Sequence, residues 1–271
     1  ENVCSVGTGN EIFYKYSHEY KDKFRWSMKP AYLCFLFEIG AADKIIFIDW
    51  DIIFFNNYSF LFDNLDDNDI LLTPHWGDMS PFRIDNKGRK VNTDFRYQFS
   101  PGIYNAGFVG ANKKGKNILE WWAKVCLYSC KENDNGLHDD QAYLSLFHLQ
   151  SDKVGILYNK GCHVAEWNKI ECKRTMKGNE VLINEKYPIV FVHFTNMCIH
   201  SIVTGKDPLL EAHLEDYIQL YKEQNKLAFP CLAIEKIRAR VALKHKFEKS
   251  FIGRLKYKIR IRTRILRFVE G

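Results

Sequence analysis

The chain has 271 residues, of which 46% are hydrophobic and 15% are aromatic, and its formal net charge is +6 at pH 7. This composition excludes an intrinsically disordered protein and is sufficient for one large hydrophobic core. The sequence contains no run of about 18 uncharged apolar residues and no basic-then-apolar segment at its N-terminus. We therefore expect a cytoplasmic protein without a membrane span, in which the eight cysteines are reduced thiols.

Hydrophobic patterning predicts alternating helices and strands, the arrangement of an α/β fold. In chain order, the predicted elements are helix 24–40, strand 44–49, helical turn 60–62, strand 69–73, strand 103–110, helix 115–127, helix 139–147, strands 154–158 and 189–193, and helix 208–224. The first helix is predicted to begin near Pro30 and to end at Gly40. Residues 76–98 are polar and are predicted to form a long excursion of the kind that covers a functional site.

Two carboxylates stand at the end of an apolar strand. The segment 44–55 reads Lys-Ile-Ile-Phe-Ile-Asp-Trp-Asp-Ile-Ile-Phe-Phe, with Asp49 and Asp51 at its centre. An unpaired buried carboxylate costs on the order of several kcal/mol, which is comparable with the stability of a domain, so something must compensate these two. Because residues i and i+2 of a strand point to the same side, Asp49 and Asp51 can converge on one cation. Oxygen ligands of this kind favour Mg²⁺ or Mn²⁺.

The C-terminal segment is strongly basic. Residues 236–271 contain thirteen Lys or Arg and two Glu, a net charge of +11, whereas residues 1–235 carry −5. Apolar residues recur among the basic ones at three- and four-residue steps, which is the pattern of a basic amphipathic helix. We expect this tail to contact an anionic membrane surface on the cytoplasmic face. Nucleic acid is a less favoured partner, and a solvated helix packed on its own domain is the simpler alternative.

Three further segments follow the Asp-x-Asp motif in the chain. They are Tyr104-Asn105-Ala106-Gly107-Phe108, Asp139-Asp140-Gln141 and Val190-Phe191-Val192-His193-Phe194-Thr195. Together with Asp49-Trp50-Asp51, they resemble the Asp-x-Asp, Asn-Ala-Gly, Asp-Gln and His-Phe elements of family 8 glycosyltransferases, the retaining enzymes that include glycogenin and lipooligosaccharide galactosyltransferases. The resemblance covers residues 29–208 and implies a GT-A fold, a Rossmann-like mixed sheet flanked by helices.

The resemblance implies a metal and donor site. Asp49, Asp51 and His193 would hold Mn²⁺ or Mg²⁺, which would bridge the diphosphate of a nucleotide-sugar, most simply a UDP-sugar. Lys29 stands near the position of a basic residue that contacts the donor in the family. Lys206 could replace the lysine that follows the His-Phe element, although its spacing from His193 is longer and the accompanying tryptophan is absent.

The resemblance also implies residues around the donor sugar. Asn105 and Gln141 supply amide donors and acceptors suited to sugar hydroxyls, and Gly107 allows the backbone to approach a ligand closely. Asp140 would face the donor sugar, whereas Asp139 could instead cap the following helix. Aromatic rings and histidines that could form an acceptor platform are His75, Trp76, His163 and Trp167.

The N-terminal region departs from the family pattern. A GT-A domain normally begins with a strand that binds the nucleotide base, but residues 1–20 contain no convincing apolar strand. We therefore expect the first βα portion to be missing from the domain, which we place at residues 1–235, ahead of the tail at 236–271. Either the sequence is a fragment or the base site is built differently.

The predicted function is that of a metal-dependent hexosyltransferase that acts on a glycan or lipid-linked acceptor, with retention of configuration. An inverting GT-A transferase would need a carboxylate base, for which Asp139 or Asp140 could serve. A metal-dependent phosphohydrolase could also carry Asp-x-Asp at a strand end. A catalytically inactive module that binds carbohydrate or membrane is a further alternative.

Overall fold

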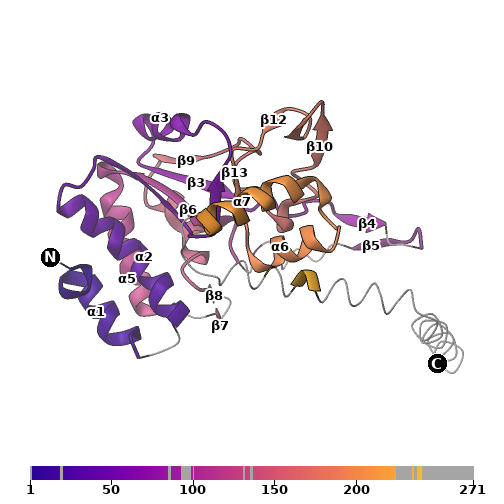
Figure 1. Ribbon diagram of the computed structural model, residues 1–271. Helices are drawn as coiled ribbons and strands as arrows, with labels where there is room; N and C mark the ends of the chain where they lie inside the picture. The colour runs from indigo at the N-terminus through magenta and orange to yellow at the C-terminus, as the bar shows by residue number, and fades with distance from the viewer. Residues whose placement is uncertain are drawn as a thin grey trace, which may run out of the picture. The chain divides into compact units, whose positions relative to one another are not determined.

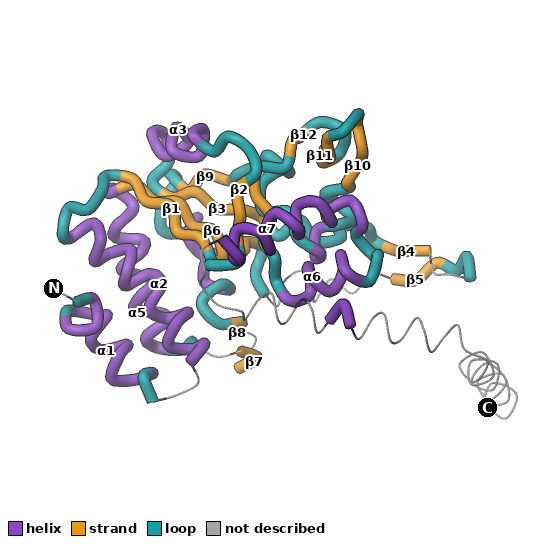
Figure 2. The backbone as a smooth tube through the Cα atoms, viewed as in Figure 1, coloured by secondary structure: helices purple, strands orange, loops and turns teal. Residues whose placement is uncertain are grey.

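The computed structural model describes residues 2–18, 21–84, 87–92, 99, 101–130, 132–134, 137–223, 234 and 237–239 (Figures 1 and 2). The chain divides into two units, residues 1–195 and 196–271. The first unit contains a mixed sheet flanked by helices, which confirms the predicted α/β class. Each unit is described by itself below.

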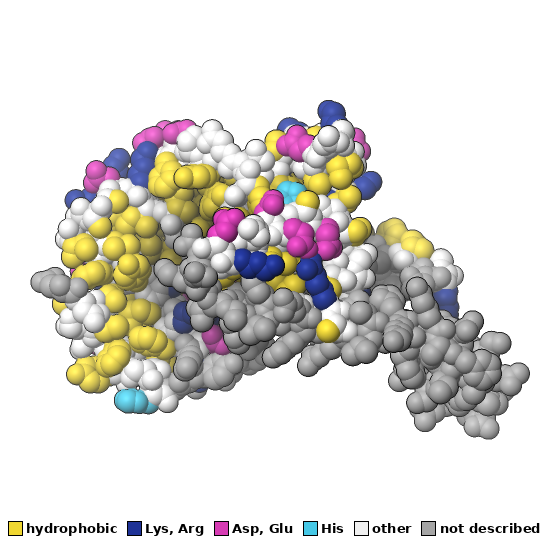
Figure 3. Space-filling model, viewed as in Figure 1, with side chains coloured by type: hydrophobic (Ala, Val, Ile, Leu, Met, Phe, Trp, Pro, Cys, Tyr) yellow, Lys and Arg dark blue, Asp and Glu magenta, His cyan; other side chains and the backbone are white. Residues whose placement is uncertain are grey.

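Three helices form one layer of the first unit: α1 (Gly7–Tyr16), α2 (Lys21–Glu38) and α5 (Lys116–Tyr128). The helices α2 and α5 lie against one face of the sheet, and α1 packs on these two helices (Figure 1), with Ile12 and Tyr16 against Ala31 of α2 and Ala123 of α5. Hydrophobic side chains also remain on the outer surface of the unit (Figure 3). Phe13 of α1, for example, is 38% exposed.

The start of α2 corrects the sequence prediction. The helix begins at Lys21, so Pro30 lies in its interior rather than near its beginning. A proline inside a helix removes one backbone hydrogen bond, and the loss is tolerated here because the surrounding turns are packed into the protein. The end of the helix agrees with the prediction, because Gly40 follows with a left-handed φ of 65°.

The central sheet has the strand order β1-β6-β3-β9. Its strands are β1 (Lys44–Ile48), β6 (Tyr104–Asn112), β3 (Ile70–Pro74) and β9 (Val154–Ile156). The β1–β6 and β6–β3 pairs are antiparallel, and β3–β9 is parallel. All nine residues of β6 are buried because α2 and α5 cover one face of the sheet and α3 (Ser59–Asp67) covers the other. Its central residues, Ala106 to Ala111, form the continuous run without polar side chains that a strand buried on both faces needs.

The remaining elements of the first unit are short. They are η1 (Val3–Ser5), β2 (Ile52–Phe54), β4 (Phe82–Ile84), β5 (Lys90–Asn92), η2 (Lys113–Gly115), β7 (Glu132–Asp134), β8 (Leu137–His138), η3 (Ala142–Leu149), η4 (Glu166–Asn168), β10 (Arg174–Lys177), β11 (Glu180–Ile183), β12 (Tyr187–Pro188) and β13 (Phe191–His193). In the long segment predicted to be an excursion, β4 and β5 form a hairpin that projects from the body of the unit (Figure 2).

Two more predictions are changed by the structure. The predicted helix 139–147 is instead the 3₁₀-helix η3, which begins at Ala142, so Asp139 and Asp140 precede it as a turn. In the N-terminal region, the described residues before β1 form only helical elements, in agreement with the absence of a predicted strand there.

The second unit contains α6 (Asn196–Val203), η5 (Pro208–Leu210) and α7 (Glu211–Glu223). Arg238 forms ion pairs with Glu211 and Glu215 of α7. Apart from residues 237–239, the predicted basic tail at 236–271 lies outside the described residues. Among the described helices, none has the length and apolarity needed to cross a bilayer.

Substitution of Phe108 tests the packing between β6 and β13. The Phe108 ring is fully buried in β6 and stacks on Phe191 of β13, with ring centroids 5.3 Å apart. We expect Phe108→Ala to lower the free energy of unfolding by about 3–5 kcal/mol, because a large cavity would remain. Urea unfolding measures the change. The control is Tyr128→Ala, at a side chain that is 82% exposed, for which little change is expected. Equal effects of the two substitutions would contradict the packing described.

Candidate active site

A turn between β1 and β2 carries the two acidic residues. The strand β1 ends at Ile48, and the Ile52 N–H donates to the Asp49 carbonyl oxygen at 3.1 Å, which closes the turn. The sequence analysis attributed convergence of the two carboxylates to alternation along a strand, and this reason was wrong. The turn instead redirects the chain so that β2 can pair with β13.

Pairing of β2 with β13 places His193 beside the turn. Ile52 is opposite His193 in this antiparallel pair, and the Phe194 N–H donates to the Asp51 carbonyl oxygen at 2.8 Å. The His193 Nε2 atom lies 3.0 Å from Asp51 Oδ1. The pairing of β2 with β13 therefore brings His193 to the acidic turn, although the two segments are about 140 residues apart in the sequence.

Asp49, Asp51 and His193 lie close enough together that they could hold a cation. One ligand atom from each of them lies within 4.8 Å of the others. Both carboxylates are partly exposed, whereas His193 is buried. Two carboxylates and one imidazole are a donor set that suits Mn²⁺ and also accepts Mg²⁺. The structure thus brings together the three residues that the sequence analysis predicted as ligands.

Gly107 leaves the space that these side chains occupy. A Cβ atom at this position would lie 2.7 Å from His193 Cε1, 2.8 Å from Asn105 Oδ1 and 3.1 Å from Asp49 Oδ2. The sequence analysis assigned Gly107 to close approach of a ligand. In the structure, the groups that approach the Gly107 backbone closely are the side chains of His193, Asn105 and Asp49, because β6 runs directly beneath them.

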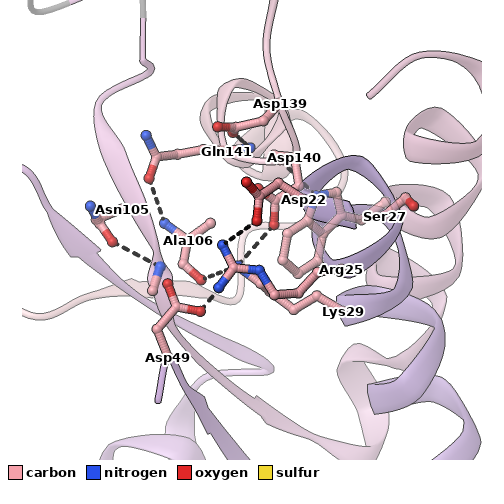
Figure 4. A network of polar contacts seen from close by, with 12 residues as sticks. Asp22, Arg25, Ser27, Lys29, Asp49, Asn105, Ala106, Asp139, Asp140 and Gln141 are labelled. Atoms are coloured by element: carbon pink, nitrogen blue, oxygen red, sulfur yellow. Dashed lines mark hydrogen bonds and ion pairs between the residues drawn. The ribbon is translucent and has the colours of Figure 1, made fainter. Parts of the chain in front are cut away.

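Lys29 reaches the site from α2 and is 6% exposed (Figure 4). Its Nζ donates to the Ala106 carbonyl oxygen at 2.9 Å and lies 3.7 Å from Asp49 Oδ1. The same atom lies 3.0 Å from Asp140 Oδ2, as an ion pair rather than an aligned hydrogen bond. Burial lowers the pKa of Lys29, but the charges of Asp140 and Asp49 outweigh it and hold the pKa above its usual 10.5. Lys29 is therefore charged.

Asp139 and Asp140 form a buried carboxyl pair beside this ammonium group. Burial, and then the charge of Asp140, raise the pKa of Asp139 to about 8. Burial also raises the pKa of Asp140, against the effect of Lys29. Asp139 therefore holds a proton near neutral pH, and Lys29 favours the charged form of Asp140 beside it. Trp122 in α5 fixes the segment, since its indole N–H donates to the Asp140 carbonyl oxygen at 2.8 Å.

The amide side chains of Gln141 and Asn105 connect β6 to neighbouring segments. Gln141 Oε1 accepts from the Ala106 N–H at 3.0 Å, and Gln141 Nε2 donates to the Pro101 carbonyl oxygen at 2.9 Å. Asn105 Oδ1 accepts from the Gly107 N–H at 2.8 Å, and Asn105 Nδ2 lies 3.1 Å from His75 Nε2. Both residues lie where the sequence analysis expected them, at the site, but their hydrogen bonds hold β6 and its neighbours in place.

Behind the ligand set lies a group of histidines. His163 Nε2 is 2.9 Å from His193 Nδ1, and the Trp167 ring packs edge-on against both imidazoles. Burial, and then the neighbouring His193, hold the pKa of His163 well below its usual 6.5. His75 and Trp167 are also in ring contact, whereas Trp76 packs against Tyr158. Of the four residues predicted to form an acceptor platform, His75, His163 and Trp167 therefore belong to one group of ring contacts with His193. Trp76 forms a separate aromatic pair with Tyr158.

One predicted residue belongs to the other unit, and three contributors were missed. Lys206 is in the second unit, which is described by itself, so its role at the site stays a prediction. The sequence analysis did not select Thr73, Asn168 or Arg174, which support His163 and its loop. Thr73 offered a signal, because it is a hydroxyl residue at the end of the apolar strand β3.

Comparison with known proteins finds one relative of interest. Over 186 residues, the chain is 28% identical to the uncharacterized protein YfnF of Bacillus subtilis strain 168. The match covers 67% of this chain and 59% of YfnF, so the chain spans less than two thirds of that relative's length. No protein-family profile and no solved structure matches the chain. Function is therefore inferred from the chemistry of the site.

The raised pKa of Asp139 makes stability depend on pH. The folded state keeps a proton on Asp139 up to about pH 8, whereas the unfolded chain releases it near the usual 3.8. The folded state therefore binds more protons between these values, and its stability falls as pH rises through this window. We expect Asp139→Asn to gain stability relative to wild type across the window, by up to about 1.4 kcal/mol per pH unit. Chemical unfolding at a series of pH values measures this. Asp152→Asn, at an exposed position, is the control. Parallel pH profiles for Asp139→Asn and wild type would contradict the shift.

The space at Gly107 gives a second prediction. Gly107→Ala would push a methyl group against His193 and Asp49, so we expect Mn²⁺ binding to weaken roughly 10-fold or more. Electron paramagnetic resonance of free Mn²⁺ during titration measures the dissociation constant, and circular dichroism verifies the fold. Unchanged Mn²⁺ affinity in a folded variant would show that the ligand set does not need this space.

Proposed function

We propose that the chain is a metal-dependent glycosyltransferase of the GT-A type, which transfers a hexose from a nucleotide-sugar to a glycan or lipid-linked acceptor. The observation that carries the proposal is the meeting of four distant segments at one place. The ligand set of Asp49, Asp51 and His193 lies against Gly107, and Lys29 connects it to Asp140. These are the segments whose sequences resemble family 8 glycosyltransferases.

The ligand set fits a divalent cation that faces a diphosphate. When bound, the cation supplies neutralisation of the negative charge that develops on the departing nucleoside diphosphate. Asp49 and Asp51 are partly exposed, so a cation held there can also be reached by a donor. A UDP-sugar is the donor that the family resemblance favours.

Asp140 is suited to act through its charge. It is 2% exposed and lies against Lys29, so its position is fixed. With Asp139 protonated and Asp140 charged beside Lys29, the negative end of this ion pair would stabilise an oxocarbenium-like transition state on the donor sugar. A buried carboxylate already paired with an ammonium group is poorly placed to take a proton from an incoming acceptor. This arrangement favours retention over inversion.

A donor screen tests the proposal. The protein is incubated with Mn²⁺ and a panel of UDP-, GDP- and CDP-sugars, and release of nucleoside diphosphate is followed. We expect release from one donor that requires Mn²⁺ and falls roughly 100-fold or more in Asp51→Asn, because charge stabilisation by a metal contributes several kcal/mol to the barrier. The matched control is Asp152→Asn, an exposed position of the first unit.

The outcomes separate the candidates. Metal-dependent release from one donor supports the transferase, and the anomeric configuration of the product then distinguishes retention from inversion. The absence of release from every donor, by folded protein that binds Mn²⁺, would contradict the proposal.

A second candidate is a metal-dependent phosphohydrolase. The observation in its favour is that Lys29 and the Asp139–Asp140 pair accompany the Asp-x-Asp turn, since a lysine and a second acidic pair also occur in such enzymes. His193 in the ligand set and the Asn-Ala-Gly segment have no role in that reaction. Release of inorganic phosphate from sugar phosphates, without release of nucleoside diphosphate from sugar donors, would favour this candidate.

A further inference from the structure

His163 lies behind the ligand histidine and contacts no other member of the ligand set through a described hydrogen bond. Its side chain is 1% exposed. The Nε2 atom lies 2.9 Å from His193 Nδ1, and the Nδ1 atom lies 2.6 Å from Thr73 Oγ1. A chain of polar contacts thus runs from Asp51 through His193 and His163 to Thr73, which belongs to the central sheet.

A bound cation would determine which ring nitrogen of His193 and of His163 carries a proton. His193 Nε2 faces Asp51 and must present a lone pair to a cation, so the proton of a neutral His193 stands on Nδ1. That N–H donates to His163 Nε2, which must therefore accept. The proton of His163 then stands on Nδ1 and is donated to Thr73 Oγ1, which accepts. The contacts are consistent with one tautomer for each ring in the loaded site.

The backbone at His163 is held in an uncommon conformation. Its φ is 61°, in the left-handed region that few non-glycine residues adopt, although histidine adopts it more often than most. Asn168 Nδ2 donates to the His163 carbonyl oxygen at 2.8 Å, and Asn168 Oδ1 accepts from Arg174 at 3.3 Å. The next residue, Val164, forms a parallel bridge with Val192 of the strand that ends in His193. Strain of this kind persists where the surrounding structure places a particular side chain.

We infer that His163 is a positioning residue, which keeps the His193 imidazole in the orientation and tautomer that leave Nε2 free for a cation, and that Thr73 fixes His163 in turn. The inference deepens the proposed function and rests on the cation site within it. His163 itself does not touch the cation. Partners of this kind behind a ligand histidine typically change metal affinity 10- to 100-fold when removed.

The test uses two variants of the same residue. His163→Phe fills the ring space but has no acceptor, whereas the amide oxygen of His163→Gln can accept from His193 Nδ1. Both variants carry the same backbone strain, so they form a matched pair. We expect His163→Phe to weaken Mn²⁺ binding by about 10- to 100-fold and His163→Gln to restore most of the loss. Paramagnetic resonance titration with Mn²⁺ measures the affinities of the full chain.

Thr73 supplies a second pair of variants, in case substitution of His163 prevents folding. Thr73→Val has nearly the same shape but no hydroxyl group, and Thr73→Ser keeps the hydroxyl. We expect weaker Mn²⁺ binding in Thr73→Val than in Thr73→Ser. In addition, ¹⁵N NMR of histidine-labelled, Mg²⁺-loaded protein should show His163 protonated on Nδ1 only, with its signals identified by their loss in His163→Gln.

Each result decides the inference. Weaker binding in His163→Phe, recovery in His163→Gln and an Nδ1-protonated His163 would support it. Unchanged binding in folded His163→Phe, equal loss in both His163 variants, or an Nε2-protonated His163 would overturn it while leaving the cation site intact. If wild-type protein binds Mn²⁺ no better than Asp51→Asn and His193→Ala do, the cation site itself fails and the inference fails with it.

Discussion

The buried ammonium group of Lys29 holds the parts of the site together. It extends from α2 and meets the Ala106 carbonyl oxygen of β6, the carboxylate of Asp140 and, at longer distance, that of Asp49. Removal of one partner from a buried ion pair leaves an uncompensated charge and costs about 3–5 kcal/mol, a large share of a domain's stability. The acidic turn, the central strand and the segment before η3 are therefore joined by a single cationic side chain.

A second support reaches the site through His193. His193 is placed by the pairing of β13 with β2, and its ring is backed by His163 and, through it, by Thr73 of β3. The ligand set thus lies between a charged support from α2 and a neutral support from the sheet. Asp139 and His163, two of the five described non-glycine residues with left-handed φ, belong to these supports.

Much of the fold could be read from residue patterns, and the failures have local causes. Strands 69–73 and 103–110 and helix 115–127 were predicted within about two residues, because continuous apolar runs and helical periodicity are strong signals. The start of α2 was missed because tertiary packing tolerated Pro30 inside a helix. The helix expected at 139–147 was missed because burial of Asp139 and Asp140 beside Lys29 overrides helix propensity.

The sequence by itself determined the α/β class, from local periodicity, and the acidic pair Asp49 and Asp51 as candidate ligands, from residue type, whereas His193 was added by the family resemblance. Only the tertiary structure decided how Asp49 and Asp51 meet His193, because that depends on β2 and β13 pairing across a long separation. Likewise, the roles of Thr73 and Gly107 follow from atoms contributed by distant segments. Contacts of this kind arise from three-dimensional packing, which no short stretch of sequence encodes.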